Sequence, residues 1–454
     1  MAPLACGGAF APLRAGPARC AGLWCVARGV KPETCTTLRE AAERQGGIPR
    51  VILKRGKARL FHLGSHLVFS GAIDRVEGVR MPTHGDTVLL YDGSKMLLGW
   101  GLFNPDSMYR VRIMQRCQDA EQQPQCALDL WQLLQTRIEE AVTLRRALGF
   151  PSEETNAYRL INSDGDHLSG LVVDVLGDLL VAAPGAAWLQ INRQTVVNLL
   201  MECTGIRNVI WRPTAGSMEQ EGLHDVDAEI FSEGRELASE QVEIREGSIP
   251  FLASPFGQKT GFYMDQRDSR AVIRRLAKGQ EVLDVYCYSG GFAINAALGG
   301  ARGVVGVDSS APAIELAEKN ATLSGVSDAC SFTQADATQY LELAKQEGRL
   351  WDLVVLDPPK LAPNRQSLQR AIPHYRRINR AAIRVLRRGG LLMTCTCSGA
   401  MTQSNKFLDV VKQAADAEGR RVTVLRVAGA SADHSVSASH PEANYLTNVL
   451  CRVL

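Results

Sequence analysis

The chain has 454 residues, and its 51 Lys and Arg residues against 48 Asp and Glu residues give a formal net charge of +3. Hydrophobic residues make up 45% and charged residues 22% of the sequence, the usual balance of a globular protein with several domains. This composition excludes a low-complexity disordered chain, a collagen and a small disulfide-rich scaffold. We also expect no membrane partner, because Asp174 and Asp178 interrupt the longest apolar region, residues 170–189.

The twelve cysteines predict neither a disulfide framework nor a metal site. They are scattered along the chain, and no CxxC pair or Cys/His cluster has the spacing of a zinc site. We therefore expect free cysteines, a reducing compartment and no bound metal.

The amino terminus has the composition of a targeting leader. Residues 1–32 contain four Lys and Arg residues, no Asp or Glu, and many Ala, Gly and Pro residues. Such a segment is typical of an organelle transit peptide, and the alternative is a disordered cytosolic tail. We expect residues 1–45 to be a disordered transit peptide whose cysteines, Cys35 included, are removed or exposed to solvent.

A basic module follows the leader. From residue 50 to residue 116 there are eleven Lys and Arg residues against five Asp and Glu residues. Short apolar runs at residues 87–90 and 108–114, bounded by turn residues, predict strands. We expect a compact β domain over residues 50–125 that either binds RNA phosphates or carries an ordinary solvated surface. The candidate RNA-binding residues are Lys54, Arg55, Lys57 and Arg59.

The middle of the chain mixes helices and strands. Apolar periodicity predicts helices over residues 128–148 and 191–203 and strands near residues 158–161, 171–175, 179–181 and 209–211. No cluster of chemically active side chains occurs here. We expect a small α+β linker domain over residues 126–248.

From residue 249 to residue 454, strands alternate with helices, which predicts a doubly wound parallel sheet of α/β class. Its first strand leads into a glycine turn that fits neither a GxGxxG dinucleotide fingerprint nor a P-loop. Acidic residues at the ends of the first three strands (Asp284, Asp308 and Asp336) instead suit S-adenosylmethionine. Asp308 would bind the ribose and Asp336 the adenine amino group, although carboxylates at such positions also cap helices. The other candidate cofactor residues here are Tyr286, Tyr288, Ser289, Gly290, Gly291 and Phe292.

The ends of the next two strands carry the candidate catalytic residues. Asp357-Pro-Pro-Lys360 follows the fourth strand, where the prolines fix the backbone at the edge at which α/β ligands bind. Cys395 and Cys397 lie at the end of the fifth strand. A cysteine at this edge is either a nucleophile or a small buried apolar residue. We expect Cys395 to be buried and Cys397 to emerge at the edge.

These residues resemble the bacterial large-subunit rRNA cytosine-5 methyltransferases, which join a PUA domain to a Rossmann-like catalytic domain. The resemblance runs from about Arg50 to the carboxyl terminus and rests on six motifs: Leu67-Val-Phe-Ser-Gly-Ala72, Lys259-Thr-Gly-Phe-Tyr-Met-Asp-Gln-Arg-Asp-Ser-Arg270, Tyr288-Ser-Gly-Gly-Phe292, Asp357-Pro-Pro-Lys360, Cys397-Ser-Gly399 and Pro441-Glu-Ala-Asn-Tyr-Leu446. It implies a PUA fold for residues 50–125 and S-adenosylmethionine in the last domain. It also implies that Cys397 is the nucleophile, that Asp357 faces the target base and that Phe262 and Gln266 contact the cofactor.

The resemblance implies formation of 5-methylcytosine in large-subunit rRNA, with Lys360 near the RNA. Two rivals are a guanine-methylating rRNA enzyme, which would need no cysteine nucleophile, and a non-catalytic ribosome-assembly factor that keeps the fold. A small-molecule methyltransferase is disfavoured by the basic module. We further expect an RNA partner and a homodimer. The bacterial-type catalytic half behind an Arg-bearing leader predicts a chloroplast location, with the mitochondrion as the alternative.

Overall fold

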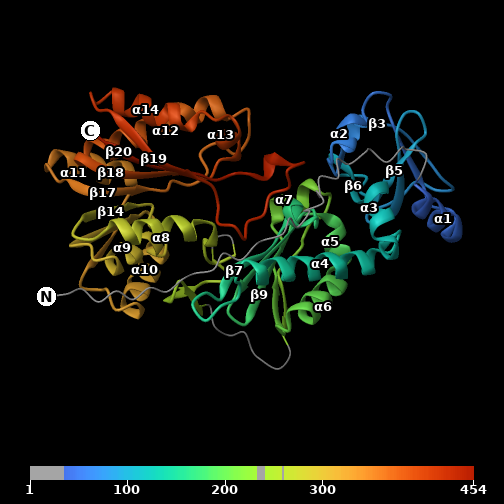
Figure 1. Cartoon of the computed structure of the whole chain (residues 1–454), viewed down its shortest axis with the longest axis horizontal. Helices are drawn as coiled ribbons and strands as arrows, with labels where there is room; N and C mark the ends of the chain where they lie inside the picture. Colours follow the sequence, from blue (N-terminus) through green and yellow to red (C-terminus); the bar gives the residue numbers. More distant parts are fainter. Residues whose placement is uncertain (1–34, 233–240, 258–259) are drawn as a thin grey trace, which may run out of the picture.

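The computed structural model describes residues 35–232, 241–257 and 260–454. Three domains lie in a row, with a β-rich domain at one end, an α/β domain at the other and a mixed domain between them (Figure 1). The expected leader, residues 1–34, lies outside the described residues. Within the described residues, no helix is long and apolar enough to span a membrane.

The β-rich domain contains a six-stranded sheet in the order β2-β6-β5-β4-β1-β3. Its strands pair antiparallel except β1 and β4, which are parallel. Strands were expected at residues 87–90 and 108–114, and β4 and β6 occupy these places. The strands are β1 (Arg50–Leu53), β2 (Leu67–Phe69), β3 (Ile73–Glu77), β4 (Thr87–Tyr91), β5 (Leu97–Phe103) and β6 (Tyr109–Arg116), and the short helices are α2 (Arg59–His62), η2 (Ser70–Ala72), α3 (Cys117–Gln122) and η3 (Pro124–Cys126).

Two expectations for the amino-terminal region are wrong. Helix α1 (Thr36–Gln45) occupies part of the segment expected to be disordered and buries Leu38 and Ala41. Cys35, directly before this helix, is buried and forms a disulfide with Cys117 of α3. The sequence did not indicate this pair because 82 positions separate the two cysteines. The apolar face of α1 explains the order of the helix, since burying it offsets the conformational entropy lost on folding.

The middle domain is α+β, as expected. Its five-stranded sheet has the order β11-β10-β9-β8-β7, and only β9 and β10 are parallel. Helices occupy both stretches predicted from periodicity. The strands are β7 (Ala157–Asn162), β8 (Leu171–Leu176), β9 (Leu179–Pro184), β10 (Asn208–Trp211) and β11 (Glu229–Ser232), and the helices are α4 (Leu130–Ala147), η4 (Ser163–Asp166), α5 (Ala187–Ile191), α6 (Arg193–Thr204) and α7 (Ala215–Gln220).

A hairpin connects the middle domain to the catalytic domain. Its strands, β12 (Val242–Glu246) and β13 (Ile249–Ala253), pair antiparallel along their full lengths. The boundary expected between residues 248 and 249 would cut this hairpin between its strands. The structure therefore places the boundary before Val242, because the two strands are hydrogen-bonded to each other.

The last domain is a seven-stranded sheet in the order β16-β15-β14-β17-β18-β20-β19. The strands from β16 to β18 are parallel, and β20 runs antiparallel between β18 and β19. The strands are β14 (Glu281–Val285), β15 (Gly303–Asp308), β16 (Cys330–Gln334), β17 (Trp351–Leu356), β18 (Leu386–Thr396), β19 (Val422–Ala428) and β20 (Thr447–Val453), and the helices are η5 (Met264–Gln266), α8 (Arg267–Leu276), α9 (Gly291–Leu298), α10 (Ala311–Leu323), α11 (Ala337–Gln346), α12 (Leu368–Arg384), α13 (Gly399–Gln403), α14 (Phe407–Asp416) and η6 (Pro441–Ala443). This Rossmann-like arrangement confirms the predicted α/β class.

Hydrophobic cores cross the domain boundaries. One core joins Leu89 and Trp100 of the β-rich sheet to Leu133 and Ile138 of α4 in the middle domain. Another joins the middle sheet to the hairpin and to the catalytic domain, where it includes Phe262. The three domains are therefore held together by buried apolar surface as well as by the chain.

Candidate active site

The candidate site lies at the carboxyl ends of the parallel strands. The order of the strands reverses between β14 and β17, and in open α/β sheets ligands bind outside such a reversal. Asp284 lies in β14, and Asp308 ends β15. Asp357 directly follows β17, and Cys397 directly follows β18. Four of the predicted site residues thus meet at one edge of the sheet.

A tightly held loop leads from β14 into α9. Tyr286, Tyr288 and Gly290 all have positive φ angles, of 66°, 48° and 79°. Every second residue of this loop is therefore in the left-handed region, which makes the turn after the strand tight. The loop is anchored twice, since Tyr288 N–H donates to Asp308 at 3.0 Å and the Ser289 carbonyl accepts from Asn320 at 3.0 Å. This loop fixes the position at which Tyr286, Tyr288 and Ser289 would meet a cofactor.

The glycines of this turn are required by packing as well as by backbone conformation. A Cβ atom on Gly290 would lie 3.2 Å from both Ala317 and Phe332, and one on Gly291 would lie 3.0 Å from Arg270 Cδ. Gly290 also has the left-handed conformation that glycine adopts without steric cost. The turn therefore packs closely against its own domain. Phe292, the next residue, is buried in the core.

Asp308 and Asp336 differ in their surroundings. Asp308 accepts from the backbone N–H groups of Tyr288 and Ser310, one on each carboxylate oxygen. A carboxylate oxygen accepts more than one hydrogen bond, so Asp308 keeps capacity for ribose hydroxyls. Asp336 is exposed and caps α11 by accepting from Gln339 N–H at 2.9 Å. Its role in the structure is the helix-capping alternative, and its contact with adenine stays a prediction.

Asp284 fits a cationic ligand. Its side chain is fully buried, and one carboxylate oxygen accepts from Ala293 N–H at 3.0 Å. The other oxygen, Oδ1, has no hydrogen-bond partner among the described residues. Burial, together with the negative charges of Asp357 and Asp308, raises the pKa of Asp284 to about 8 against the lowering effect of the Ala293 hydrogen bond. A bound group with a positive charge or a donor would satisfy this oxygen, and S-adenosylmethionine supplies both.

Asp284 should give the protein a distinctive pH dependence. Its pKa of about 8 in the folded state lies above the ordinary value of 3.8, so between these pH values the folded state holds a proton that the unfolded chain has lost. Its contribution to the free energy of unfolding therefore falls as pH rises through this window, by up to about 1.4 kcal/mol per pH unit. Asp284→Asn should remove this loss. Between pH 5 and pH 8, the free energy of unfolding in urea should therefore rise for the variant relative to wild type.

The matched control for this measurement is the same substitution at the exposed Asp336. An equal difference between wild type and Asp284→Asn at pH 5 and at pH 8 would contradict the prediction.

Asp357 is positioned by a buried amide pair. Gln266 Nε2 donates to Asp357 Oδ2 at 3.0 Å, and Asn448 Nδ2 donates to Gln266 Oε1 at 2.8 Å. Asn448 also donates to Ser269 Oγ at 2.8 Å. Gln266 was predicted as a cofactor contact, and the structure joins it to Asp357. Asn448 was missed because β20 brings it to the site from a distant part of the sequence.

The two cysteines at the end of β18 have different environments. Cys395 is fully buried in the core, and burial raises the pKa of its thiol well above the ordinary value of 9.0. Cys397 is half-buried at the edge of the sheet, with Sγ 3.7 Å from the Pro358 carbonyl. This is the placement expected for each of them. The nucleophilic role of Cys397 stays a prediction.

Three further polar side chains come from the segments next to Gln266 and Asn448. Burial raises the pKa of Tyr263, and the charges of Tyr288, Asp265, Asp357 and Cys397 raise it further. The Tyr263 ring packs edge-on against that of Tyr288 in the loop after β14, with centroids 5.1 Å apart. Tyr445 Oη donates to Asp265 Oδ2 at 2.6 Å. These residues lie in the motifs Lys259 to Arg270 and Pro441 to Leu446, but no individual role was assigned to them from the sequence.

Phe262 lies beneath the candidate site. It is buried, packs on Phe251 at a ring distance of 5.2 Å and lies under the Arg270 guanidinium. The structure thus gives this predicted cofactor contact a core position. Lys259 of the same motif lies outside the described residues.

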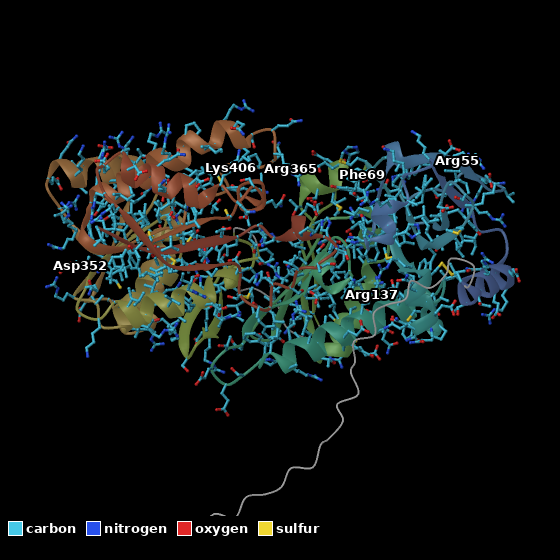
Figure 2. All side chains as sticks on the ribbon, turned by 45° about the horizontal axis from the view of Figure 1, so that its top comes forward. Arg55, Phe69, Arg137, Asp352, Arg365 and Lys406 are labelled. Carbon is cyan, nitrogen blue, oxygen red and sulfur yellow. A yellow bond between two sulfur atoms is a disulfide. The ribbon has the colours of Figure 1, made fainter. Side chains whose placement is uncertain are left out.

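The predicted RNA-binding residues of the β-rich domain form an exposed loop. Lys54, Arg55, Lys57 and Arg59 are all exposed, and Lys54 Nζ donates to the Gly71 carbonyl at 3.0 Å. Beside Gly71, Phe69 is 45% exposed, and its ring lies 5.0 Å from that of Tyr109. Figure 2 shows Arg55 and Phe69 on the same side of the molecule as Arg365 and Lys406 of the catalytic domain.

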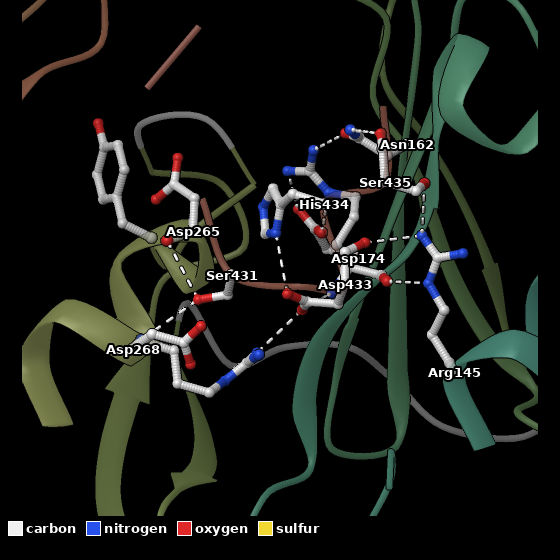
Figure 3. A network of polar contacts seen from close by, with 12 residues as sticks. Arg145, Asn162, Asp174, Asp265, Asp268, Ser431, Asp433, His434 and Ser435 are labelled. Carbon is white, nitrogen blue, oxygen red and sulfur yellow. Dashed lines mark hydrogen bonds and ion pairs between the residues drawn. The ribbon is translucent and has the colours of Figure 1, made fainter. Parts of the chain in front are cut away.

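Hydrogen bonds from two buried ion pairs join the catalytic domain to the middle domain (Figure 3). Arg145 of α4 pairs with Asp166 through both carboxylate oxygens, and it donates to the Asp433 carbonyl at 2.7 Å. The Asp433 carboxylate accepts from Arg159 N–H at 2.9 Å and from Arg267 at 3.0 Å. The positive charge of Arg267 and a hydrogen bond with His434 lower the pKa of Asp433 despite its burial. This network fixes the segment that leads from β19 to β20.

One carboxylate contacts histidines from both neighbouring domains. Asp164 of the middle domain lies 2.5 Å from Nε2 of His66 in the β-rich domain and 3.5 Å from Nε2 of His440 in the carboxyl-terminal segment. The two imidazole rings are 5.4 Å apart. Across the described residues, no group of three or more His, Cys, Asp or Glu side chains is arranged to hold a metal ion. The cluster therefore serves as a junction of the three domains.

The comparisons with known proteins define the class of protein. Residues 227–423 match the model of S-adenosylmethionine-dependent methyltransferases, and residues 51–116 match the model of PUA-like domains. A methyltransferase chain solved with SAH has a TM-score of 0.74 at 20% identity, over 89% of this chain and 99% of that chain. A Streptococcus mutans chain described as SAM-dependent gives 0.73 at 19%, over the same shares. The chain is a SAM-dependent methyltransferase with a PUA-like domain.

Full-length relatives then identify the family. The ribosomal RNA large subunit methyltransferase I of Salmonella arizonae is 32% identical over 408 residues, covering 89% of this chain and 98% of the relative. That of Erwinia tasmaniensis is 32% identical over 407 residues, covering 89% and 99%. The chain therefore belongs to the ribosomal RNA large subunit methyltransferase I family, and its cofactor is S-adenosylmethionine.

Proposed function

We propose that this chain methylates carbon 5 of a cytosine in large-subunit rRNA and that Cys397 is the nucleophile. The observation that carries the proposal is the position of Cys397. Its half-buried thiol lies 3.7 Å from the Pro358 carbonyl, directly beside Asp357 and at the sheet edge that holds Asp284 and Asp308. The relatives named for rRNA methylation support rRNA as the substrate.

The chemistry follows from the residues at this edge. S-adenosylmethionine, held by Asp284, Asp308 and the loop of residues 286–290, supplies an activated methyl group when bound. The Cys397 thiolate adds to C6 of the cytosine, which makes C5 nucleophilic enough to take the methyl group. Asp357 hydrogen-bonds the ring near N3 and stabilises the charge that develops there. Loss of the C5 proton then expels the cysteine.

The substrate cytosine should be single-stranded or flipped out of its helix. A stacked and paired cytosine does not expose both faces of the ring, and this reaction needs the thiol on one side and the methyl donor beside C5. We propose that the PUA-like domain binds the RNA through Lys54, Arg55, Lys57 and Arg59. The exposed ring of Phe69 is available to stack on a base.

The experiment that tests this function uses RNA that contains 5-fluorocytosine. Fluorine at C5 blocks the final elimination, so wild-type protein with S-adenosylmethionine should form a covalent adduct that migrates as a larger species on a denaturing gel. Bisulfite sequencing of rRNA from cells lacking the protein should then reveal the lost 5-methylcytosine. A guanine methyltransferase would form no adduct, and an assembly factor would transfer no methyl group.

Two features of the proposal concern the whole protein in its cell. The Arg-bearing leader supports targeting to the chloroplast, with the mitochondrion as the alternative, and fusion of residues 1–34 to a fluorescent protein tests it. A homodimer also stays a prediction. Sedimentation of the purified chain by analytical ultracentrifugation measures its mass in solution and tests this prediction.

A further inference from the structure

The sequence around the candidate site has an unusual charge distribution. No Asp or Glu occurs between Asp357 and Asp409, whereas ten Lys and Arg residues do. If the 48 acidic residues of the chain were evenly spread, about five would fall in a stretch of this length. The stretch contains α12, β18 and the loops at the site edge, so its positive charge lies on the catalytic domain itself.

The structure divides these basic residues into two groups. At the end of α12 far from the site, and just beyond it, Arg380, Arg384 and Arg387 form ion pairs with acids of other elements. Arg384 pairs with Glu342 at 3.2 Å and with Glu418 at 2.9 Å. Arg387 pairs with Asp352 at 3.0 Å. These arginines neutralise neighbouring charges and hold the fold.

The second group lies toward the site. We define the basic face as the exposed side chains of Lys360, Arg365, Arg370, Arg377 and Lys406. Over the part of the chain that the structure describes, Arg365 has one distant acidic partner, Glu442 at 3.8 Å, and the other four form no ion pair. Like charges that are left unpaired on one surface repel one another, so their excess indicates an anionic partner.

The basic face borders the candidate site directly. Lys360 is two residues from Pro358, whose carbonyl contacts Cys397. The loop that carries Lys360 and Arg365 is fixed to the cysteine segment, because Ala362 N–H donates to Ser398 Oγ at 3.0 Å. The part of the basic face that carries Lys360 and Arg365 is therefore attached to the segment that holds Cys397.

Figure 2 relates this face to the PUA-like domain. In that view Lys406, Arg365, Phe69 and Arg55 follow one another along one side of the molecule, from the catalytic domain to the β-rich domain. Exposed basic side chains thus lie at both ends of this side of the molecule, in the predicted RNA-binding loop and near the candidate site. A polyanion that contacts both would be held at two separated places with the candidate site at one of them.

We propose that the basic face binds the phosphate backbone of the RNA that flanks the target nucleotide. The inference rests on the proposed function for its RNA substrate and adds a second RNA-binding surface, on the catalytic domain. Phosphates are the regularly spaced anions of that substrate, and exposed Lys and Arg side chains bind them by releasing counterions. Contacts on both sides of the nucleotide would hold the strand while the base leaves its helix.

The test is a triple variant, Arg365→Gln with Arg370→Gln and Lys406→Gln, in the full chain. These side chains are exposed and make no contact with Asp284, Asp308 or Cys397, so the affinity for S-adenosylmethionine should equal that of wild type. The affinity for polycytidylate should fall about tenfold or more, and the slope of log K against log salt should decrease by about two, since each lost phosphate contact on a single strand removes about 0.7.

The matched control removes three exposed basic residues that lie toward the opposite edge of the sheet, Arg275, Lys319 and Lys345, by the same change to Gln. Its affinity and salt slope should equal those of wild type. Wild-type affinity and slope in the test variant would overturn the proposal and leave an acidic protein as the partner of this face. If wild type transfers no methyl group to rRNA while the test variant still loses polycytidylate binding, the proposed function fails and the basic face stands.

Discussion

Cys397→Ala should abolish 5-methylcytosine formation, with a loss of activity on the order of 10³-fold or more, because the other two described thiols near this edge, Cys287 and Cys395, are buried. The substitution removes only a half-buried sulfur. The variant should therefore keep its fold and its affinity for S-adenosylmethionine, measured by calorimetry. It should also form no covalent adduct with 5-fluorocytosine RNA.

The matched control is Cys203→Ala, a half-buried free cysteine of α6 in the middle domain. It should methylate rRNA at the wild-type rate. Full activity of Cys397→Ala would eliminate the cysteine mechanism and would favour direct attack by a nitrogen of guanine. Loss of activity together with loss of cofactor binding would instead point to a structural effect.

Arg145→Met should destabilise the protein more than any surface substitution. Arg145 is 1% exposed and binds Asp166, the Asp433 carbonyl and the Arg159 carbonyl. Methionine keeps the length of the side chain but leaves the buried Asp166 carboxylate without its cation. Removing one partner of a buried pair costs about 3–5 kcal/mol, which urea unfolding measures as a lower free energy of unfolding.

Arg146→Met, at the exposed neighbouring position, is the control and should change the free energy of unfolding by less than about 0.5 kcal/mol. A decrease of less than about 1 kcal/mol in the free energy of unfolding of Arg145→Met would show that the network of Figure 3 contributes little to stability. The same variant should also methylate rRNA more slowly, because Asp433 lies in the segment that leads to Asn448 and thus to Gln266 and Asp357.

Local patterns in the sequence predicted the residues of the candidate site better than the residues that hold them in position. Asp284, Asp308 and Asp357 could be found because each lies at the end of an apolar run, and parallel strands bring such ends to one edge. Cys395 and Cys397 could be distinguished by their distance from that edge. These inferences needed only the periodicity of the strands and the topology of the fold.

Contacts between distant segments could not be read in this way. Arg145 and Asp433 are 288 residues apart, and nothing near either residue indicates the other. The same holds for the Cys35–Cys117 disulfide and for Asn448, which reaches Gln266 across 182 positions. The predicted domain boundary cut the hairpin of β12 and β13 because the sequence pattern did not reveal that these two strands pair with each other. These features depend on how the domains pack, which the sequence pattern does not encode locally.

The core that the β-rich and middle domains share has a consequence for how the protein meets its substrate. Removing the β-rich domain would uncover Leu133 and Ile138, so this domain cannot be detached as an independent module without exposing an apolar surface that promotes aggregation. A PUA-like domain on a flexible tether would let the enzyme search many spacings. If the PUA-like domain binds the RNA as we propose, the shared core sets the distance between that contact and the methylated nucleotide, and the enzyme should favour RNA whose fold matches this distance.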